Sequence, residues 1–218
     1  MLVRLRIALP DRPGSLGRVT SALGLAGADI AAVRVLESES GRALDDVVVN
    51  LHDRNHLRRV TAEVNAVPGV EVIASQWGVP PVTGHADLEL AAQVLERAHT
   101  GPAEALGVLV DGAPGALGAD WAALLEYRSP DDIAVRLISP GGPAALTPPS
   151  VPLRTLAVSL DDGQGALVPL NEGSGAGVGL LLVRGEGPQF HLSELWRLGQ
   201  FGRLLGSSIA RFDPVPCD

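Results

Sequence analysis

The hydrophobic periodicity of residues 1–77 is the feature that most narrows the fold of this chain. Apolar and polar residues alternate over 2–9, which is the pattern of a half-buried strand. Leu16, Val19 and Leu23 then recur at spacings of three and four, which is one face of a helix. The same patterns continue along the chain and predict strands at about 2–9, 28–38, 43–51 and 70–77, and helices at about 14–26 and 54–67.

This order of elements, βαββαβ, favours one architecture. Two helices that each carry a single apolar stripe can cover one face of a four-stranded sheet, which is a ferredoxin-like two-layer α+β sandwich. The other face and the edges of such a sheet remain available for pairing. We therefore expect this module to self-associate, whatever its function.

A second module follows a short linker. Two adjacent prolines and flanking glycines at 78–85 interrupt both helix and strand patterns. Residues 86–212 then predict helices at about 86–98, 102–115 and 190–212, with strands at about 120–127, 132–139, 154–160, 165–170 and 177–183. Helices that flank an antiparallel sheet predict a second α+β domain, with 213–218 as a tail.

Charge and composition exclude several classes of protein. The net charge is −8, and residues 81–218 hold eight arginines against 16 acidic residues, so a nucleic-acid-binding surface is not expected. Cys217 is the only cysteine, which excludes an intramolecular disulfide. The N-terminal residues lack the pattern of a signal peptide, and no apolar run reaches membrane-span length. We expect a cytoplasmic protein that binds neither nucleic acid nor membrane.

The turn "DRPGSLG" at 11–17 is the main candidate site. A glycine-containing loop that opens a helix presents unpaired backbone N–H groups beside the positive end of the helix dipole, which suits a carboxylate. Pro13 is expected in the first helical turn, with Asp11 near the cap. On spacing alone, the same residues also make an ordinary helix start.

Residues 1–77 resemble the ACT domain, a small-molecule sensing module of amino-acid metabolism. The resemblance rests on Asp11-Arg12-Pro13-Gly14-Ser15-Leu16 after the first strand and on Gly27-Ala28-Asp29-Ile30 at the second. It implies binding of an amino acid or similar small carboxylate at a dimer interface, by Asp11, Arg12, Pro13, Gly14, Ser15, Leu16, Ala28, Asp29 and Ile30.

Two of these positions depart from the family pattern, because Asp11 and Asp29 stand where members often carry asparagine. Ionised aspartates accept hydrogen bonds only, so they suit the ammonium group of a ligand. The backbone of Gly14, Ser15 and Leu16 would then take the ligand's carboxylate. Equally, the two aspartates are compatible with an altered or lost pocket.

Residues 86–212 resemble a GAF domain. The resemblance rests on a Val-Pro-Leu strand, a glycine turn, a Gly-x-Leu strand and the helix start "FHLSEL" at 190–195. GAF domains place a helix and a ligand-binding lid where this chain has only a Pro/Gly-rich loop at 140–152. We therefore expect no large cofactor pocket and no cofactor.

Three other sequence patterns favour a structural role over nucleotide binding, metal binding or catalysis. The glycine run at 173–179 does not fit G-x-G-x-x-G and leads into a strand, so we expect a hairpin turn. His52 and His56 have no adjacent third ligand for a metal. His191, Ser193 and Glu194 lie at a helix start, where they suit capping by Ser193 or His191. We expect neither a catalytic nor a metal site.

The sequence therefore predicts a non-catalytic regulatory protein, a homodimer that responds to an amino acid or small carboxylate effector. The alternative is a ligand-free ACT oligomerisation module in a structural protein, or in one that regulates an enzyme or another regulator as its partner.

Overall fold

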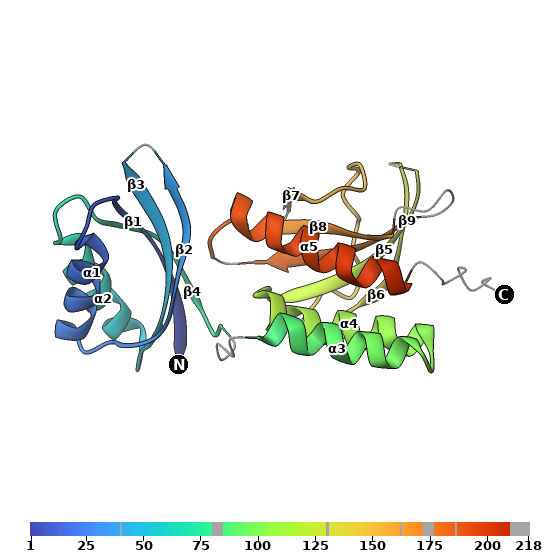
Figure 1. The fold of residues 1–218 in the computed structure, drawn as a ribbon, viewed down its shortest axis with the longest axis horizontal. Helices are drawn as coiled ribbons and strands as arrows, with labels where there is room; N and C mark the ends of the chain where they lie inside the picture. Colours follow the sequence, from blue (N-terminus) through green and yellow to red (C-terminus); the bar gives the residue numbers. More distant parts are fainter. Residues whose placement is uncertain are drawn as a thin grey trace. The chain divides into compact units, whose positions relative to one another are not determined.

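The computed structural model describes residues 1–39, 41–79, 85–129, 131–161, 163–171, 177–185 and 187–209. The chain divides into two compact units (Figure 1). The first comprises Met1–Val82 with Glu186–Pro188, and the second comprises Thr83–Gly185 with Gln189–Asp218. Most of the predicted linker, the glycine run up to residue 176 and the tail with Cys217 lie outside the described residues.

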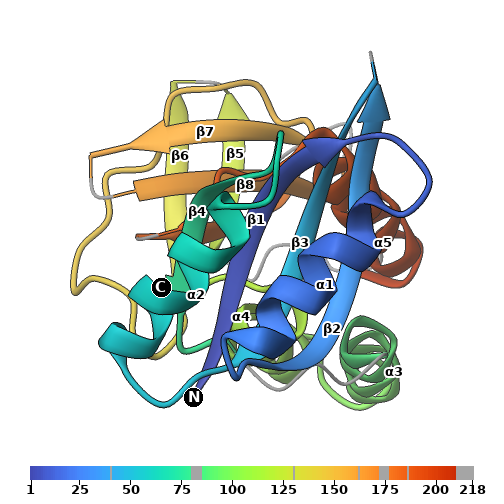
Figure 2. The same cartoon turned by 90° about the vertical axis from the view of Figure 1, so that its left-hand side faces the viewer.

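The first unit is the predicted ferredoxin-like sandwich. Its elements are β1 (Leu2–Pro10), α1 (Ser15–Leu25), β2 (Asp29–Glu39), β3 (Arg42–Asn50), α2 (Arg54–Asn65) and β4 (Glu71–Trp77). The strands pair antiparallel in the order β2-β3-β1-β4. Figure 2 shows α1 and α2 together on one face of this sheet. The α+β fold class is confirmed, and each boundary lies within two residues of its expected position.

Aliphatic side chains fill the space between this sheet and its helices. Val3, Leu5, Ile7 and Leu9 of β1 are buried and pack against buried residues of both helices. This burial is the main stabilising term for the unit, because each buried aliphatic side chain contributes about 1.5–3 kcal/mol of transfer free energy. The alternation that predicted β1 therefore reflects the two faces of the sheet.

The other side of β1 carries a buried ion pair. Arg6 lies directly opposite Asp46 of β3 in the strand register. Its Nε and Nη2 donate to the two carboxylate oxygens of Asp46 at 2.8 and 2.9 Å. A bidentate guanidinium–carboxylate pair of this kind fixes the register of the two central strands.

The second unit is a five-stranded antiparallel sheet with three helices. Its elements are α3 (Ala86–Ala98), α4 (Pro102–Leu117), β5 (Trp121–Ser129), β6 (Asp132–Ile138), β7 (Leu156–Leu160), β8 (Gly163–Asn171), β9 (Gly177–Arg184) and α5 (Leu192–Ile209). The strand order is β6-β5-β9-β8-β7. Within the described ranges, none of α1 to α5 combines the length and the apolarity of a bilayer-crossing helix.

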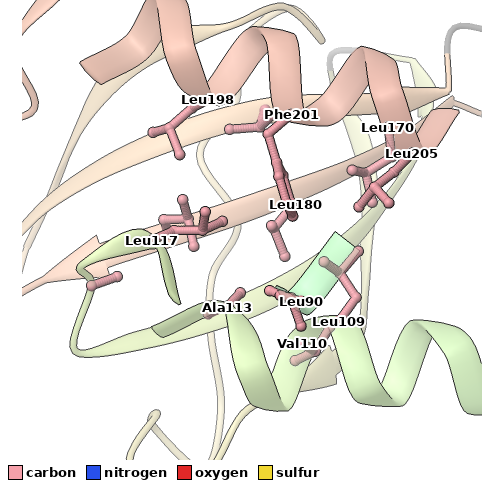
Figure 3. Close-up of a cluster of buried hydrophobic side chains, with 14 of the residues drawn as sticks. Leu90, Leu109, Val110, Ala113, Leu117, Leu170, Leu180, Leu198, Phe201 and Leu205 are labelled. Atoms are coloured by element: carbon pink, nitrogen blue, oxygen red, sulfur yellow. The ribbon is translucent and has the colours of Figure 1, made fainter. Parts of the chain in front are cut away.

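One face of this sheet is covered by all three helices. Figure 3 shows Leu109 and Ala113 of α4 and Phe201 and Leu205 of α5 converging with Leu180 of β9 in a single buried cluster. The alternate residues of the strands point the other way. The sheet therefore separates two hydrophobic layers.

The opposite face is covered by the loop between β6 and β7. Leu153 of this loop packs against the layer that contains Leu167 and Tyr127. A Cβ added at Gly179 would lie 2.9 Å from Leu153 Cδ1, and one at Gly177 would overlap Leu153 Cδ2. Leu153 thus occupies space that the two glycines leave open beside the sheet.

Candidate functional site

The start of α1 differs from its predicted form. The helix begins at Ser15, and Gly14 is the N-cap residue, with φ at +85°. Pro13 precedes the helix, so its predicted place in the first turn is wrong. Asp11 lies three residues before Gly14 and is therefore not the N-cap residue itself. Gly14 has no side chain, so the cap residue itself supplies no acceptor to the first amides of α1.

Backbone bonds shape the turn before α1. The Asp11 N–H donates to the carbonyl of Gly41 at 2.9 Å, and the Ser15 N–H donates to that of Arg12 at 3.1 Å. The Ser15 amide is therefore already used inside the turn, which corrects its predicted role toward a carboxylate. The amides of Leu16 and Gly17 follow that of Ser15 in the first turn of α1. Residues 11–14 are all exposed.

The structure separates the two halves of the predicted site. The turn at 11–14 follows the end of β1 at which Pro10 pairs with Arg42. Ala28, Asp29 and Ile30 lie at the opposite end, where Asp29 pairs with Asn50. Eleven residues of α1 separate the two ends, and a helix of that length spans about 16 Å. A single amino acid cannot touch both halves within one chain.

A buried histidine joins the start of α2 to the end of α1. His56 Nε2 lies 3.0 Å from the carbonyl oxygen of Ala26, the C-cap of α1, and His52 N–H donates to His56 Nδ1 at 3.4 Å. The two imidazole rings stack with centroids 5.2 Å apart. Since Nδ1 accepts, Nε2 carries the proton and donates to Ala26.

This role for His56 was missed, although the spacing could have revealed it. His56 precedes Val60 and Val64 by four and eight residues, which places it on the apolar face of α2. Asp53 caps that helix by accepting from the His56 N–H at 2.7 Å, and this hydrogen bond lowers the pKa of Asp53. No group of three or more potential metal ligands occurs among the described residues.

A shallow groove runs between the two helices of the first unit. It begins at Gly14 and follows α1 along Gly17, Arg18 and Ser21. Glu63 is among the residues that line it on the side of α2. Arg18 Nη2 donates to Ser15 Oγ at 3.3 Å, which places one cation beside the first turn of α1.

Asp45 is a second residue that the predicted site omitted. Only 2% of its surface is exposed, and its Oδ1 has no hydrogen-bond partner among the described residues. Burial raises the pKa of its carboxyl group, and the neighbouring charges of Asp46 and Asp11 raise it further. The sequence indicated the burial of Asp45, because alternate residues of a strand share one face of the sheet and Asp45 alternates with the core residues Val47 and Val49.

In the second unit, His191, Ser193 and Glu194 form a helix start. Glu194 Oε2 accepts from the His191 N–H at 3.0 Å, while Nδ1 of His191 accepts from the Ser193 N–H at 3.3 Å. This reciprocal pattern is a capping box at the start of α5, in which His191 is the cap. Capping was therefore the correct interpretation of these residues.

A family model described as "ACT domain" matches residues 1–74. NAD-dependent malic enzyme 1 of Bacillus subtilis (strain 168) is 34% identical over 67 residues. That match covers 31% of this chain and 15% of the malic enzyme, so the chain spans a small part of this relative.

Solved structures show weaker likenesses. A GAF domain from Pseudomonas syringae pv. tomato aligns with 57% of this chain and 86% of its own, at 16% identity and a TM-score of 0.45. A formyltetrahydrofolate deformylase from Pseudomonas putida KT2440 aligns with 46% of this chain and 39% of its own, at 16% identity and a TM-score of 0.28. No functional conclusion follows from likenesses at these TM-scores.

ACT domains are regulatory modules that bind small molecules. The motif at 11–16, the βαββαβ order and the sheet order β2-β3-β1-β4 all agree with the family match. Residues 1–74 of this chain are an ACT domain.

Proposed function

We propose that this chain is a non-catalytic regulatory protein whose ACT domain binds an amino acid, or a similar small carboxylate, between two copies of the chain. The observation that carries the proposal is the exposed start of α1, with glycine as its N-cap residue, in a domain of this family. The amides of Leu16 and Gly17 and the positive end of the helix dipole suit the ligand's carboxylate there.

The separation of the two site halves supports an interface between copies. Asp11 lies at one end of α1 and Asp29 at the other. A two-fold axis that sets two first units antiparallel would bring Asp11 of one copy to Asp29 of the second. Residues 11–16 and 28–30 would then line two equivalent sites in one homodimer.

Regulation would follow by population shift. A ligand that touches two copies binds the dimer more tightly than the monomer, so it favours one arrangement of the two chains. Ligand binding would then be coupled to the state of the second module, or to binding of the dimer by an enzyme or regulator.

Calorimetry with a panel of amino acids tests the proposal on the full chain. We expect one amino acid to bind the wild type and to promote dimerisation in sedimentation experiments. Asp11→Ala and Asp29→Ala should each abolish binding, whereas Glu71→Gln, an exposed control in β4, should leave it intact.

Mixing the two variants tests the shared site. If residues of two copies form it, a heterodimer of Asp11→Ala with Asp29→Ala contains one intact site, so the mixture should recover part of the lost binding. The proposal fails if no amino acid binds at millimolar concentration and if Asp11→Ala and Gly14→Val change nothing.

A ligand-free oligomerisation module is the second candidate. It is favoured by Val33 and Val35, which are 41% and 59% exposed on the edge strand β2. Exposed β-branched residues on an edge strand suit pairing with another chain. In that case sedimentation would show a dimer that no amino acid affects, and a pull-down would recover the regulated partner.

A further inference from the structure

Asp45 is an acidic residue on the helix-covered face of the ACT sheet. The strand register places it directly opposite Ile7 of β1 and Val35 of β2. Residues opposite each other in antiparallel strands share a face, and Ile7 belongs to the core beneath the helices. The Asp45 side chain therefore points toward the helix layer, where the core is otherwise built from aliphatic residues.

This carboxylate lacks the partner that a buried charge requires. Its Oδ1 accepts no hydrogen bond from any described residue, although the side chain is 2% exposed. The charged groups found to act on it are Asp46 and Asp11, which are both acidic and raise its pKa. A buried carboxylate without a donor destabilises the fold, and arrival of a cation or donor would relieve that cost.

Asp45 lies at the end of the sheet where α1 begins. Pro10, the last residue of β1, pairs with Arg42, and Asp45 is three residues further along β3. Ser15, the first residue of α1, is 2% exposed, so this turn of the helix packs down on the same end. The negative charge of Asp11, in the turn at 11–14, also raises the pKa of the Asp45 carboxyl group.

Two complementary groups thus lie toward the same end of the domain. The positive end of the α1 dipole attracts a carboxylate, and Asp45 Oδ1, which has no partner among the described residues, attracts a cationic hydrogen-bond donor. An α-amino acid carries both groups on a single carbon atom, whereas a simple carboxylate carries only one. Of these two ligands, only the amino acid brings an ammonium group that can donate to the buried Asp45 carboxylate.

We propose that Asp45 binds the ammonium group of the effector and makes the ACT domain select α-amino acids over carboxylates that lack an amine. This inference rests on the proposed function and adds a specificity residue to its site. Because Asp45 is 2% exposed, this binding requires the turn at 11–14 to move as the ligand enters.

Titration calorimetry on the full chain tests this selectivity. For each amino acid that binds, the matching acid without the amine is titrated in parallel, for example propionate beside alanine. We expect the wild type to bind the amino acid about tenfold or more tightly than the deaminated acid. Asp45→Asn should bind the amino acid about tenfold less tightly and the deaminated acid unchanged. The control Glu71→Gln, in a residue paired with Ala8 on the other face of the sheet, should match the wild type.

A second measurement needs no variant. Binding of an ammonium group favours the ionised form of Asp45, so the wild type should release a proton on binding in mildly acidic buffer. Buffers of different ionisation enthalpy report that release, and the affinity should fall as the pH is lowered.

The outcomes separate the two proposals. If no amino acid binds the wild type, the proposed function and this inference both fail. If amino acids bind but the wild type does not prefer them over their deaminated acids, or if Asp45→Asn binds them as the wild type does, only the role of Asp45 is overturned.

Discussion

Arg184 and Glu194 form a buried ion pair that joins the end of β9 to the start of α5. Arg184 Nη2 donates to Glu194 Oε1 at 2.8 Å, and the two side chains are 1% and 5% exposed. Arg184 Nε also donates to the carbonyl of Gly118 at 2.7 Å, and its guanidinium lies 3.8 Å from the ring centroid of Phe190. Glu194 therefore serves both this pair and the capping box of α5.

Removal of Glu194 should destabilise the second unit strongly. Glu194→Ala breaks this buried ion pair by removing its carboxylate, which costs about 3–5 kcal/mol of unfolding free energy. Urea denaturation followed by circular dichroism measures this loss. The matched control is Glu104→Ala, which removes the exposed partner of Arg97, where an ion pair contributes at most about 1 kcal/mol. Equal effects of the two substitutions would contradict the role of the buried pair.

Substituting alanine for each of two glycines of the first unit should change the unfolding free energy in opposite directions. Gly14 has a φ of +85°, so Gly14→Ala should cost about 1 kcal/mol although no atom lies within 4 Å of the added Cβ. Gly17 has helical geometry and equally open space, so Gly17→Ala should stabilise α1 by about 0.5–1 kcal/mol. Thermal unfolding of both variants measures the difference. A stabilising effect of Gly14→Ala would contradict the cap geometry.

The Tyr127 hydroxyl should not stabilise the fold at neutral pH, and it should destabilise the fold at alkaline pH. Its hydroxyl is buried without a hydrogen-bond partner among the described residues, and burial raises its pKa to about 12. Tyr127→Phe should therefore be neutral or stabilising by about 1 kcal/mol. Since the folded state holds the proton more tightly than an unfolded tyrosine of pKa about 10, wild-type stability should fall as pH rises above 10.

The tyrosine titration can be followed directly, because Tyr127 is the only tyrosine of the chain. The ultraviolet absorbance of tyrosinate reports its ionisation alone, and Tyr127→Phe should remove the alkaline loss of stability that this group causes. An ordinary tyrosine titration in the folded protein would contradict the buried position.

Leu153 and Gly177 should be coupled in a double-mutant cycle. Gly177→Ala forces a Cβ into Leu153 Cδ2, which should cost about 1–3 kcal/mol by overpacking. In the background of Leu153→Ala the same change should cost less, because the space is then empty. Additive effects in denaturant unfolding would show that Leu153 does not lie against β9.

Periodicity alone determined the elements and the layers of both units. The alternation in β1 and the apolar stripe of α1 depend on residues close together in sequence, so they predicted the strand, the helix and the buried face of each. The motif at 11–16 likewise located the exposed turn and the family of the first unit.

Tertiary structure alone decided how the site is arranged. Asp45 and Asp46 are adjacent acids, yet the register puts one beneath the helices without a partner and the other beside Arg6. The same register sends Asp11 and Asp29 to opposite ends of α1. Strand register depends on contacts between residues some 40 positions apart in sequence, which local patterns do not encode. For that reason the sequence located the turn, and only the fold identified the buried carboxylate beside it.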